Sequence, residues 1–415
     1  MRIDRLSLVA IAMFVSSTAS TSKLSSENAQ LAEIRVAIER GDFGFSDADK
    51  QLAMQGAIRF FTPYPGGNGR SCSTCHDPAD GYSLAPRTVE RRWQLLQAAK
   101  RLDREADDPL FRSIDADDGR DDYSTLRSRA LFKVHVPLPN RVRLADSPDE
   151  QSVTVLRAVP PLSSLKHTAP YQQDRTMATL EDQVRAALIA HMEVTTPPAE
   201  EFVESVAFFE RGLFATEAAR KISAALDHGT AIPDVEPKLS ALERRGQDRF
   251  EFFCGRCHGG PAQVENRENR IFPPFDGSTN PVSINVGISN PLPEGLKSDI
   301  HGPGFDLPAQ RFLVDLPSGK TSELASSDPG TVLTDVRALE TVAGNQVFNR
   351  FDIPQLRGIN ATAPYFHDHR AATLEDVLRH YQSFFAFINE VRGLPLPKIP
   401  DEDIEPIIAY MRVAL

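Results

Sequence analysis

The sequence has few cysteines, tryptophans and methionines, and it carries no excess of positive charge. Among its 415 residues are four cysteines, one tryptophan and six methionines, and 57 acidic side chains outnumber 46 basic ones for a net charge of −11. A chain of this charge does not neutralise phosphates, so we expect no nucleic acid partner. The 24 glycines and 31 prolines are too few for a low-complexity chain. The composition therefore indicates an acidic globular protein, long enough for two or three domains.

Long hydrophobic runs are also missing, and the one short run lies near the N-terminus. Arg2 and Arg5 precede a ten-residue apolar run over 6–15, and small residues follow at 16–20. This order predicts a secretory signal peptide over 1–20. The run falls well short of the about 20 apolar residues that a membrane-spanning helix needs. We therefore expect export to a periplasm and no integral membrane span.

All four cysteines belong to one pattern, C-x-x-C-H, which occurs twice. The two copies are CSTCH (Cys72, Cys75, His76) and CGRCH (Cys254, Cys257, His258). This pentapeptide is the attachment signal for c-type haem, in which two thiols bind the porphyrin and the histidine ligates iron. In a zinc site the two cysteine pairs usually lie some 15–20 residues apart, much closer than in this chain. A thioredoxin-like motif needs no histidine after its cysteines, and disulfides would leave both histidines unexplained. The sequence predicts two covalently bound haem c groups, with His76 and His258 as iron ligands.

Each motif follows a segment with helical spacing. Gly56 and Phe60 lie four residues apart in the segment 47–61, and Gly246 and Phe250 do so in 238–253. A small residue and an aromatic on one helix face suit close packing against a second helix. Apolar residues at helical spacing predict those second helices over 199–214 and 402–415, with a linker over 231–237.

An internal repeat indicates that the two halves are duplicates. TAPYQQDRTMATLEDQV begins at Thr168, and TAPYFHDHRAATLEDVL begins at Thr362, an offset of 194 residues without a gap. In each copy the threonine of Thr-Leu-Glu-Asp is expected to cap a helix. The predicted fold is mainly α, with two c-type cytochrome domains over 21–232 and 233–415. The first would carry a long insertion at about 86–150.

The repeat register makes the two haem sites unequal. Tyr381, in the helix after the second repeat, aligns with Ala187 in the first. A phenol can ligate iron and a methyl group cannot, so one haem would be closed and the other open. Tyr381 could instead be a half-buried aromatic with a bonded hydroxyl, and His380 is a neighbouring rival for the ligand.

These motifs resemble the di-haem bacterial cytochrome c peroxidase and MauG family. The resemblance covers essentially the whole mature chain and implies two mainly α domains with a calcium ion at their interface. It implies that the N-terminal haem meets hydrogen peroxide and that the C-terminal haem stores or relays electrons. The family's peroxidases have methionine at the position of Tyr381, whereas its MauG-like members carry tyrosine there, as this chain does. The family's glutamine and glutamate near the open haem correspond here to Gln183 and Glu193, and a glutamate there can move the protons of peroxide.

The chain departs from the family pattern at two places. Gln173 stands where the family has a tryptophan between its haems, and the sole tryptophan, Trp93, is expected to be a core or interface residue. Ala158 stands where a calcium-binding asparagine is expected, so one calcium ion is compatible with the sequence but not required. The acidic stretch 115–118 lacks the spacing of a calcium loop and is expected to be solvated.

The sequence therefore predicts an exported peroxidase-type oxidoreductase with a redox protein or protein substrate as electron donor. Two alternatives stay open. One is a non-enzymatic di-haem electron-transfer cytochrome, and the other is a dioxygen-using relative that acts on an organic substrate at the open haem.

Overall fold

The computed structural model describes residues 29–235, 237–260, 283–298, 300, 302, 304–316, 318–333, 348–393 and 396–415. The signal peptide expected over 1–20 lies outside these residues. Within the described ranges, no helix is both long and apolar enough to cross a membrane.

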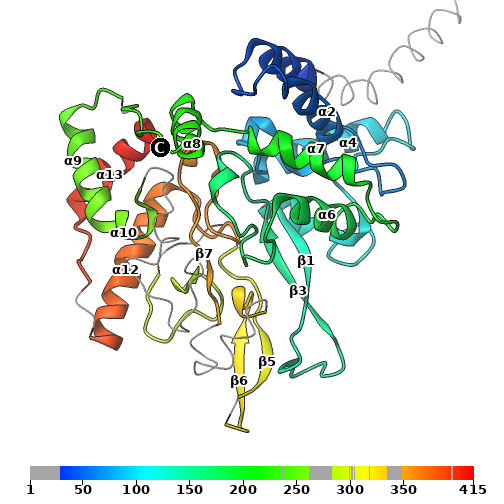
Figure 1. Ribbon diagram of the computed structural model, residues 1–415. Coiled ribbons are helices and arrows are strands. Elements are labelled where there is room, and N and C mark those ends of the chain that lie inside the picture. The colour runs from blue at the N-terminus through cyan, green and yellow to red at the C-terminus, as the bar shows by residue number, and fades with distance from the viewer. Residues whose placement is uncertain are drawn as a thin grey trace, which may run out of the picture. The chain divides into compact units, whose positions relative to one another are not determined.

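Helices make up most of the secondary structure, which confirms the prediction of a mainly α chain (Figure 1). A helix over 29–40 comes first. The longer helices after it are α2 (Lys50–Phe61), α4 (Pro86–Lys100), α6 (Leu180–Ala190), α7 (Glu200–Arg211), α8 (Glu217–His228), α9 (Ala241–Phe253), α12 (Leu374–Arg392) and α13 (Asp401–Ala414). Short helical turns are α3 (Cys72–Cys75), η1 (Pro78–Asp80), η2 (Ser113–Asp115), α5 (Ser124–Arg129), η3 (Leu165–His167), α10 (Gly255–His258), η5 (Thr331–Leu333) and η7 (Ile359–Ala361).

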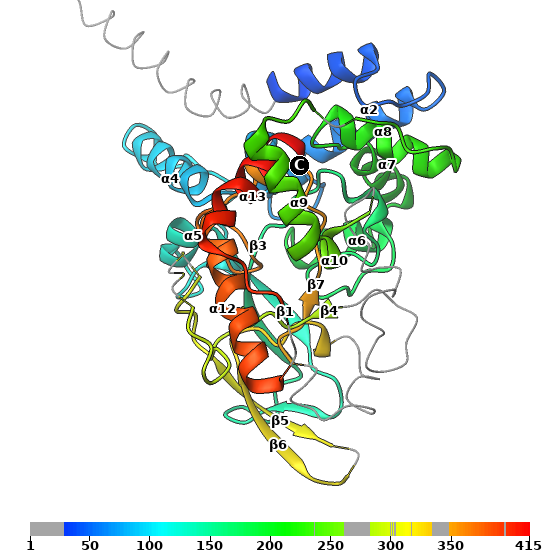
Figure 2. The same cartoon turned by 90° about the vertical axis from the view of Figure 1, so that its left-hand side faces the viewer.

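Small antiparallel sheets, which the sequence analysis did not predict, accompany the helices. One pairs β1 (Leu131–Pro137) with β3 (Ser152–Ala158), and another has the order β2 (Val142–Leu144), β5 (Gln310–Asp315), β6 (Thr321–Ser326). A third pairs β4 (Ser283–Ile284) with β7 (Phe351–Asp352). The β5–β6 hairpin is the long yellow ribbon in Figure 2. Its apolar side chains, with those of β1, β2 and β3, form a core of their own that includes Val142, Val155 and Phe312.

The chain divides into two compact units that interleave along the sequence. Unit 1 holds the described residues up to 130 and 184–212, and unit 2 holds the described residues of 131–183 and 213–415. One division between them falls inside α6. The expected cytochrome domains, 21–232 and 233–415, cut the chain differently and stay a prediction.

In unit 1, α2 packs closely against α7, the helix predicted over 199–214. A Cβ added at Gly56 would overlap the carbonyl oxygen of Ser205, so only glycine permits this approach. The Phe60 ring meets the Phe209 ring edge-on, with 5.4 Å between centroids. The predicted glycine–aromatic contact is confirmed in this unit.

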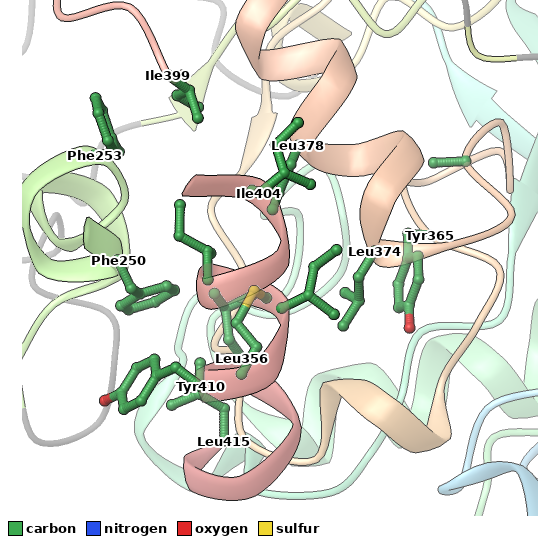
Figure 3. Close-up of a cluster of buried hydrophobic side chains, with 14 of the residues drawn as sticks. Phe250, Phe253, Leu356, Tyr365, Leu374, Leu378, Ile399, Ile404, Tyr410 and Leu415 are labelled. Atoms are coloured by element: carbon green, nitrogen blue, oxygen red, sulfur yellow. The ribbon is translucent and has the colours of Figure 1, made fainter. Parts of the chain in front are cut away.

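In unit 2, α9 packs against α13 in the same manner. A Cβ added at Gly246 would overlap the carbonyl oxygen of Pro406. Figure 3 shows the Phe250 ring facing Tyr410 of α13, with ring centroids 5.5 Å apart. Leu374 and Leu378 of α12 complete this core. Each haem-attachment motif thus directly follows a helix held against a partner by glycine.

The two copies of the repeat have the same backbone features, residue for residue. A residue of positive φ precedes each copy, Ser164 at 63° and Gly358 at 83°, and the 3₁₀ turns η3 and η7 follow these residues. A β-bridge then joins Tyr171 to Met177 in the first copy and Tyr365 to Ala371 in the second.

Both helices that follow the repeats start at the predicted threonine cap. The Asp182 backbone N–H donates to Oγ1 of Thr179, and that of Asp376 donates to Oγ1 of Thr373, each over 3.1 Å. These caps fix where α6 and α12 begin. They therefore fix which side of each helix the residues one or two turns later lie on.

Candidate functional site

The first candidate haem site consists of Cys72, Cys75 and His76 in unit 1. The two cysteines open and close α3, whose start is capped by Ser71 and Thr74. The Nδ1 of His76 lies 2.8 Å from the carbonyl oxygen of Tyr82. Burial lowers the pKa of His76 to about 4, so the ring is neutral near pH 7 and Nδ1 carries the proton that the carbonyl accepts. The Nε2 lone pair is left available for iron.

The second candidate haem site, Cys254, Cys257 and His258 in unit 2, has the same chemistry. The chain turns from α9 through Cys254 into α10, and the Nδ1 of His258 lies 2.9 Å from the carbonyl oxygen of Pro354. Burial lowers the pKa of His258 to about 4, which again leaves a neutral imidazole with a free Nε2.

The donor set in each site fits a c-type haem. None of the four cysteines forms a disulfide, and all are half-buried thiols, two beside each histidine. Burial raises the pKa of the Cys72 thiol well above its usual value and that of Cys254 to about 12, so these are neutral thiols. Two thiols and one neutral imidazole per site are the groups that thioether attachment and axial ligation require.

Tyr381 lies beside the second haem site. It is on α12, and its pKa is raised, first by burial and then by the nearby thiols of Cys257 and Cys254. Its ring packs against Phe385 with 5.8 Å between centroids. The structure thus brings the predicted ligand and the attachment cysteines of the same haem together.

His380, the rival ligand, is fully buried and already engaged. Its Nδ1 lies 3.0 Å from Oγ of Ser298, and its Nε2 lies 2.7 Å from the carbonyl oxygen of Val286. Burial lowers the pKa of His380 to about 4, so the neutral ring donates from Nε2 and accepts at Nδ1. With both nitrogens used, His380 has no lone pair to offer iron.

Glu193 is tied to the chain that leads into the first haem site. The Nδ2 of Asn68 donates to Oε2 of Glu193 over 2.8 Å, and the Asn68 backbone N–H donates to the carbonyl oxygen of Met192 over 2.8 Å. Glu193 has a positive φ of 55° and its side chain is exposed. Gln183 is half-buried in the first turn of α6, ten residues earlier.

Asn68 is a functional candidate that the sequence analysis missed. It belongs to no motif, and its partners lie about 125 residues away. The only signal in the sequence is its position four residues before Cys72.

The expectation of a solvated loop over 115–118 is wrong for Asp115. Its carboxylate pairs with the guanidinium of Arg70 over 2.6 Å, and both side chains are 1% exposed. Asp117 and Asp118 are exposed, as expected. The buried pair supports the loop immediately before Cys72, because Arg70 also donates to the carbonyl oxygens of Pro109 and Leu110.

Trp93 packs within unit 1, as expected for a core residue. Its ring meets those of Phe111 and Tyr123 at centroid distances of 5.0 and 5.8 Å, and the Arg127 guanidinium lies 4.9 Å above it.

Gln173, at the family's tryptophan position, donates from Nε2 to the carbonyl oxygen of Ala158 over 3.2 Å. Beside it, buried Arg157 pairs with Asp174 and with Asp328 over 2.5 and 2.6 Å. Among the described residues, no cluster of three or more His, Cys, Asp or Glu side chains could hold a metal ion. The calcium ion therefore stays a prediction from the resemblance.

Proteins similar to this chain were found among solved structures. No family model matches the chain, and neither does any curated protein. A MauG-like protein associated with microbial copper homeostasis is 15% identical, with 89% of this chain and 90% of that one covered and a TM-score of 0.44. The diheme peroxidase BthA from Burkholderia thailandensis is 14% identical, with 88% and 86% covered and a TM-score of 0.43. A hydrazine synthase structure from Kuenenia stuttgartiensis is 13% identical, with 80% and 93% covered and a TM-score of 0.34.

Proposed function

We propose that this protein is a di-haem c-type oxidoreductase of the cytochrome c peroxidase and MauG kind. It would use hydrogen peroxide at the first haem site and oxidise an external electron donor, a redox protein or a protein side chain, through the second. The observation that carries the proposal is the pair of neutral histidines, His76 and His258, each beside two thiols outside any disulfide and each with Nε2 left for iron.

The two sites would divide the work because their distal helices differ. Haem iron supplies peroxide binding and electron transfer. Tyr381 lies near the cysteines of the second site and would close that haem as a ligand. Ala187, its counterpart in the first repeat, has no ligating atom and would leave the first haem open to peroxide.

Near the open haem, Glu193 and Gln183 would handle peroxide. The Glu193 carboxylate would take the proton from the inner peroxide oxygen and return it to the outer oxygen, which leaves as water. Asn68 would hold that carboxylate in place through its 2.8 Å hydrogen bond.

The wider organisation is part of the proposal. The matched backbone features of the two repeats support two cytochrome domains related by internal duplication, 21–232 and 233–415, with an insertion at about 86–150. The charged and apolar pattern of residues 1–20 supports a signal peptide and a periplasmic location. One calcium ion is proposed only from the family resemblance.

The test is the visible and EPR spectra of the ferric holoprotein, before and after one equivalent of hydrogen peroxide without a reductant. We expect a high-spin ferric signal that vanishes at once as the Soret band shifts. A reaction that starts only after the second haem is reduced would contradict the role given to Tyr381.

The same spectra decide between the alternatives. Two six-coordinate haems that ignore peroxide would identify an electron-transfer cytochrome. Inertness to peroxide with tight dioxygen binding by the reduced protein would identify the dioxygen-using relative.

A further inference from the structure

His191 occupies a distinctive position at the end of the helix that carries Ala187. Its backbone N–H donates to the carbonyl oxygen of Ala187 over 3.0 Å, so the helical path continues to this residue. Residues four apart lie on the same helix face, one turn above one another. The half-buried His191 side chain therefore follows Ala187 on the face that the repeat register assigns to the haem.

The backbone of His191 is anchored to the chain before the first haem site. Its carbonyl oxygen accepts hydrogen bonds from Nδ2 of Asn68 and Nη1 of Arg70, each over 3.1 Å. The Arg70 guanidinium is itself fixed by the buried pair with Asp115. This anchoring holds His191 at a set position relative to Cys72, two residues beyond Arg70.

His191 and His76 also lie within electrostatic range of one another. After burial, the charge of His191 is a further cause of the lowered pKa of His76. The two imidazoles thus belong to one electrostatic environment in unit 1, one from the C-x-x-C-H motif and one from the end of the helix that carries Ala187.

The repeat register shows what His191 replaces. An offset of 194 residues takes His191 to Phe385, which packs against Tyr381 in unit 2. The second site thus has a phenol and a phenyl ring on this face, whereas the first has a methyl group and an imidazole. The imidazole can donate or accept a hydrogen bond, and the methyl group leaves room for a small molecule beside it.

We propose that His191 faces the open side of the first haem and hydrogen-bonds the small molecule bound to iron there. The proposal rests on the proposed function, because it requires a haem whose sixth position is open. It gives the first site a half-buried polar contact two residues before Glu193, whose own carboxylate is exposed and held by Asn68.

The test uses carbon monoxide as the probe on the reduced holoprotein, with the C–O stretch measured by infrared spectroscopy. A hydrogen-bond donor near the bound oxygen lowers this frequency. We expect His191→Leu to shift one C–O band upward and His191→Gln, which keeps a donor, to shift it less. His228→Leu is the control, because His228 is an exposed residue at the end of α8 and should leave every band in place. Equal covalent haem content in all variants shows that each has folded.

The outcomes separate this proposal from the proposed function. An unchanged spectrum in His191→Leu, in a protein that binds carbon monoxide at the first haem, overturns the role of His191 alone. If His191→Leu binds carbon monoxide at the first haem and the wild type does not, then His191 ligates iron, which also overturns the proposal. Failure of wild type and variant alike to bind it at the first haem overturns the open site and the proposed function together.

Discussion

The side-chain amide of Asn68 holds the carboxylate of Glu193, with 2.8 Å between Nδ2 and Oε2. The same amide nitrogen lies 3.1 Å from the carbonyl oxygen of His191, so a single side chain orients both ends of the turn 191–193. Two residues proposed to contact peroxide thus depend on a third that does not.

Replacing Asn68 should therefore slow the reaction with peroxide without changing the resting spectrum. In Asn68→Ala the carboxylate is free to move, and we expect the rate to fall about 10-fold, less than the roughly 10²-fold or greater loss expected when proton transfer itself is removed in Glu193→Gln. Stopped-flow absorbance at the Soret band after one equivalent of peroxide measures both. Asn389→Ala, which removes a hydrogen-bonding asparagine from α12, is the control. Wild-type speed in Asn68→Ala alongside a slow Glu193→Gln would mean that Asn68 does not position the carboxylate.

Tyr381 should set the potential of the second haem. A methionine sulfur stabilises Fe(II) relative to a phenolic oxygen, so Tyr381→Met should raise the midpoint potential in a redox titration. Tyr381→Phe removes only the hydroxyl and should add a second high-spin ferric signal to the EPR spectrum. Tyr365→Phe, at a buried tyrosine in the same unit, should leave the spectrum as it is. An unaltered spectrum in Tyr381→Phe would mean that Tyr381 only packs against its neighbours and does not ligate iron.

The helix crossings at Gly56 and Gly246 should not tolerate a methyl group. Alanine favours a helix by about 1 kcal/mol over glycine, but here its Cβ would overlap a backbone carbonyl of the partner helix. We expect Gly56→Ala and Gly246→Ala each to lower the free energy of unfolding by about 1–3 kcal/mol, the cost of overpacking. Urea denaturation measures the change. Stabilisation by either crossing substitution would contradict the packing.

His367 should make the protein sensitive to acid. It is 5% exposed, its ring lies 3.9 Å from that of Phe351, and neither ring nitrogen has a hydrogen-bond partner among the described residues. Burial lowers its pKa from 6.5 to about 3. Because the folded state resists protonation, this group's contribution to stability is complete above pH 6.5 and is lost as the pH falls towards 3.

The size of this effect can be measured by replacing the ring. Below pH 6.5 this group lowers the free energy of unfolding by about 1.4 kcal/mol per pH unit. Between pH 6.5 and 5 the free energy of unfolding of His367→Phe should therefore fall by about 2 kcal/mol less than that of wild type. Urea midpoints at pH 7 and pH 5 test this, with His228→Gln, at an exposed histidine, as the control. An equally steep decline in His367→Phe would show that His367 is not buried neutral.

Local patterns in the sequence were sufficient to predict the crossing helices and the helix caps, and local patterns alone also carry the prediction of the haem-attachment sites. The Cys72 and Cys254 motifs are contiguous, and the spacing of Gly56 and Phe60 reads directly as a helix face. The sheets could not be predicted in this way, because β2 gains its partner β5 from more than 160 residues away. Asp115 shows the same limit, since its acidic neighbours indicate solvent whereas its distant partner, Arg70, buries it.

The candidate site contains both residues that the sequence could identify and residues that it could not. Tyr381 could be found because the repeat gives it a counterpart, Ala187. His191 has a counterpart too, Phe385, but that comparison gains meaning only once the charge of His191 is found to lower the pKa of His76. Asn68 has no counterpart and no motif, and only its hydrogen bonds identify it.

The two proximal histidines differ in how far along the chain their carbonyl partners lie. The partner of His76 is six residues away, at Tyr82, whereas that of His258 is 96 residues away, at Pro354. The ring of His76 can therefore be oriented by a short loop soon after that stretch has been synthesised. The ring of His258 has no such carbonyl until most of the C-terminal half exists. We therefore expect the imidazole of His76 to meet its carbonyl partner earlier in synthesis than that of His258, so that the site proposed to meet peroxide is ordered before the site proposed to relay electrons.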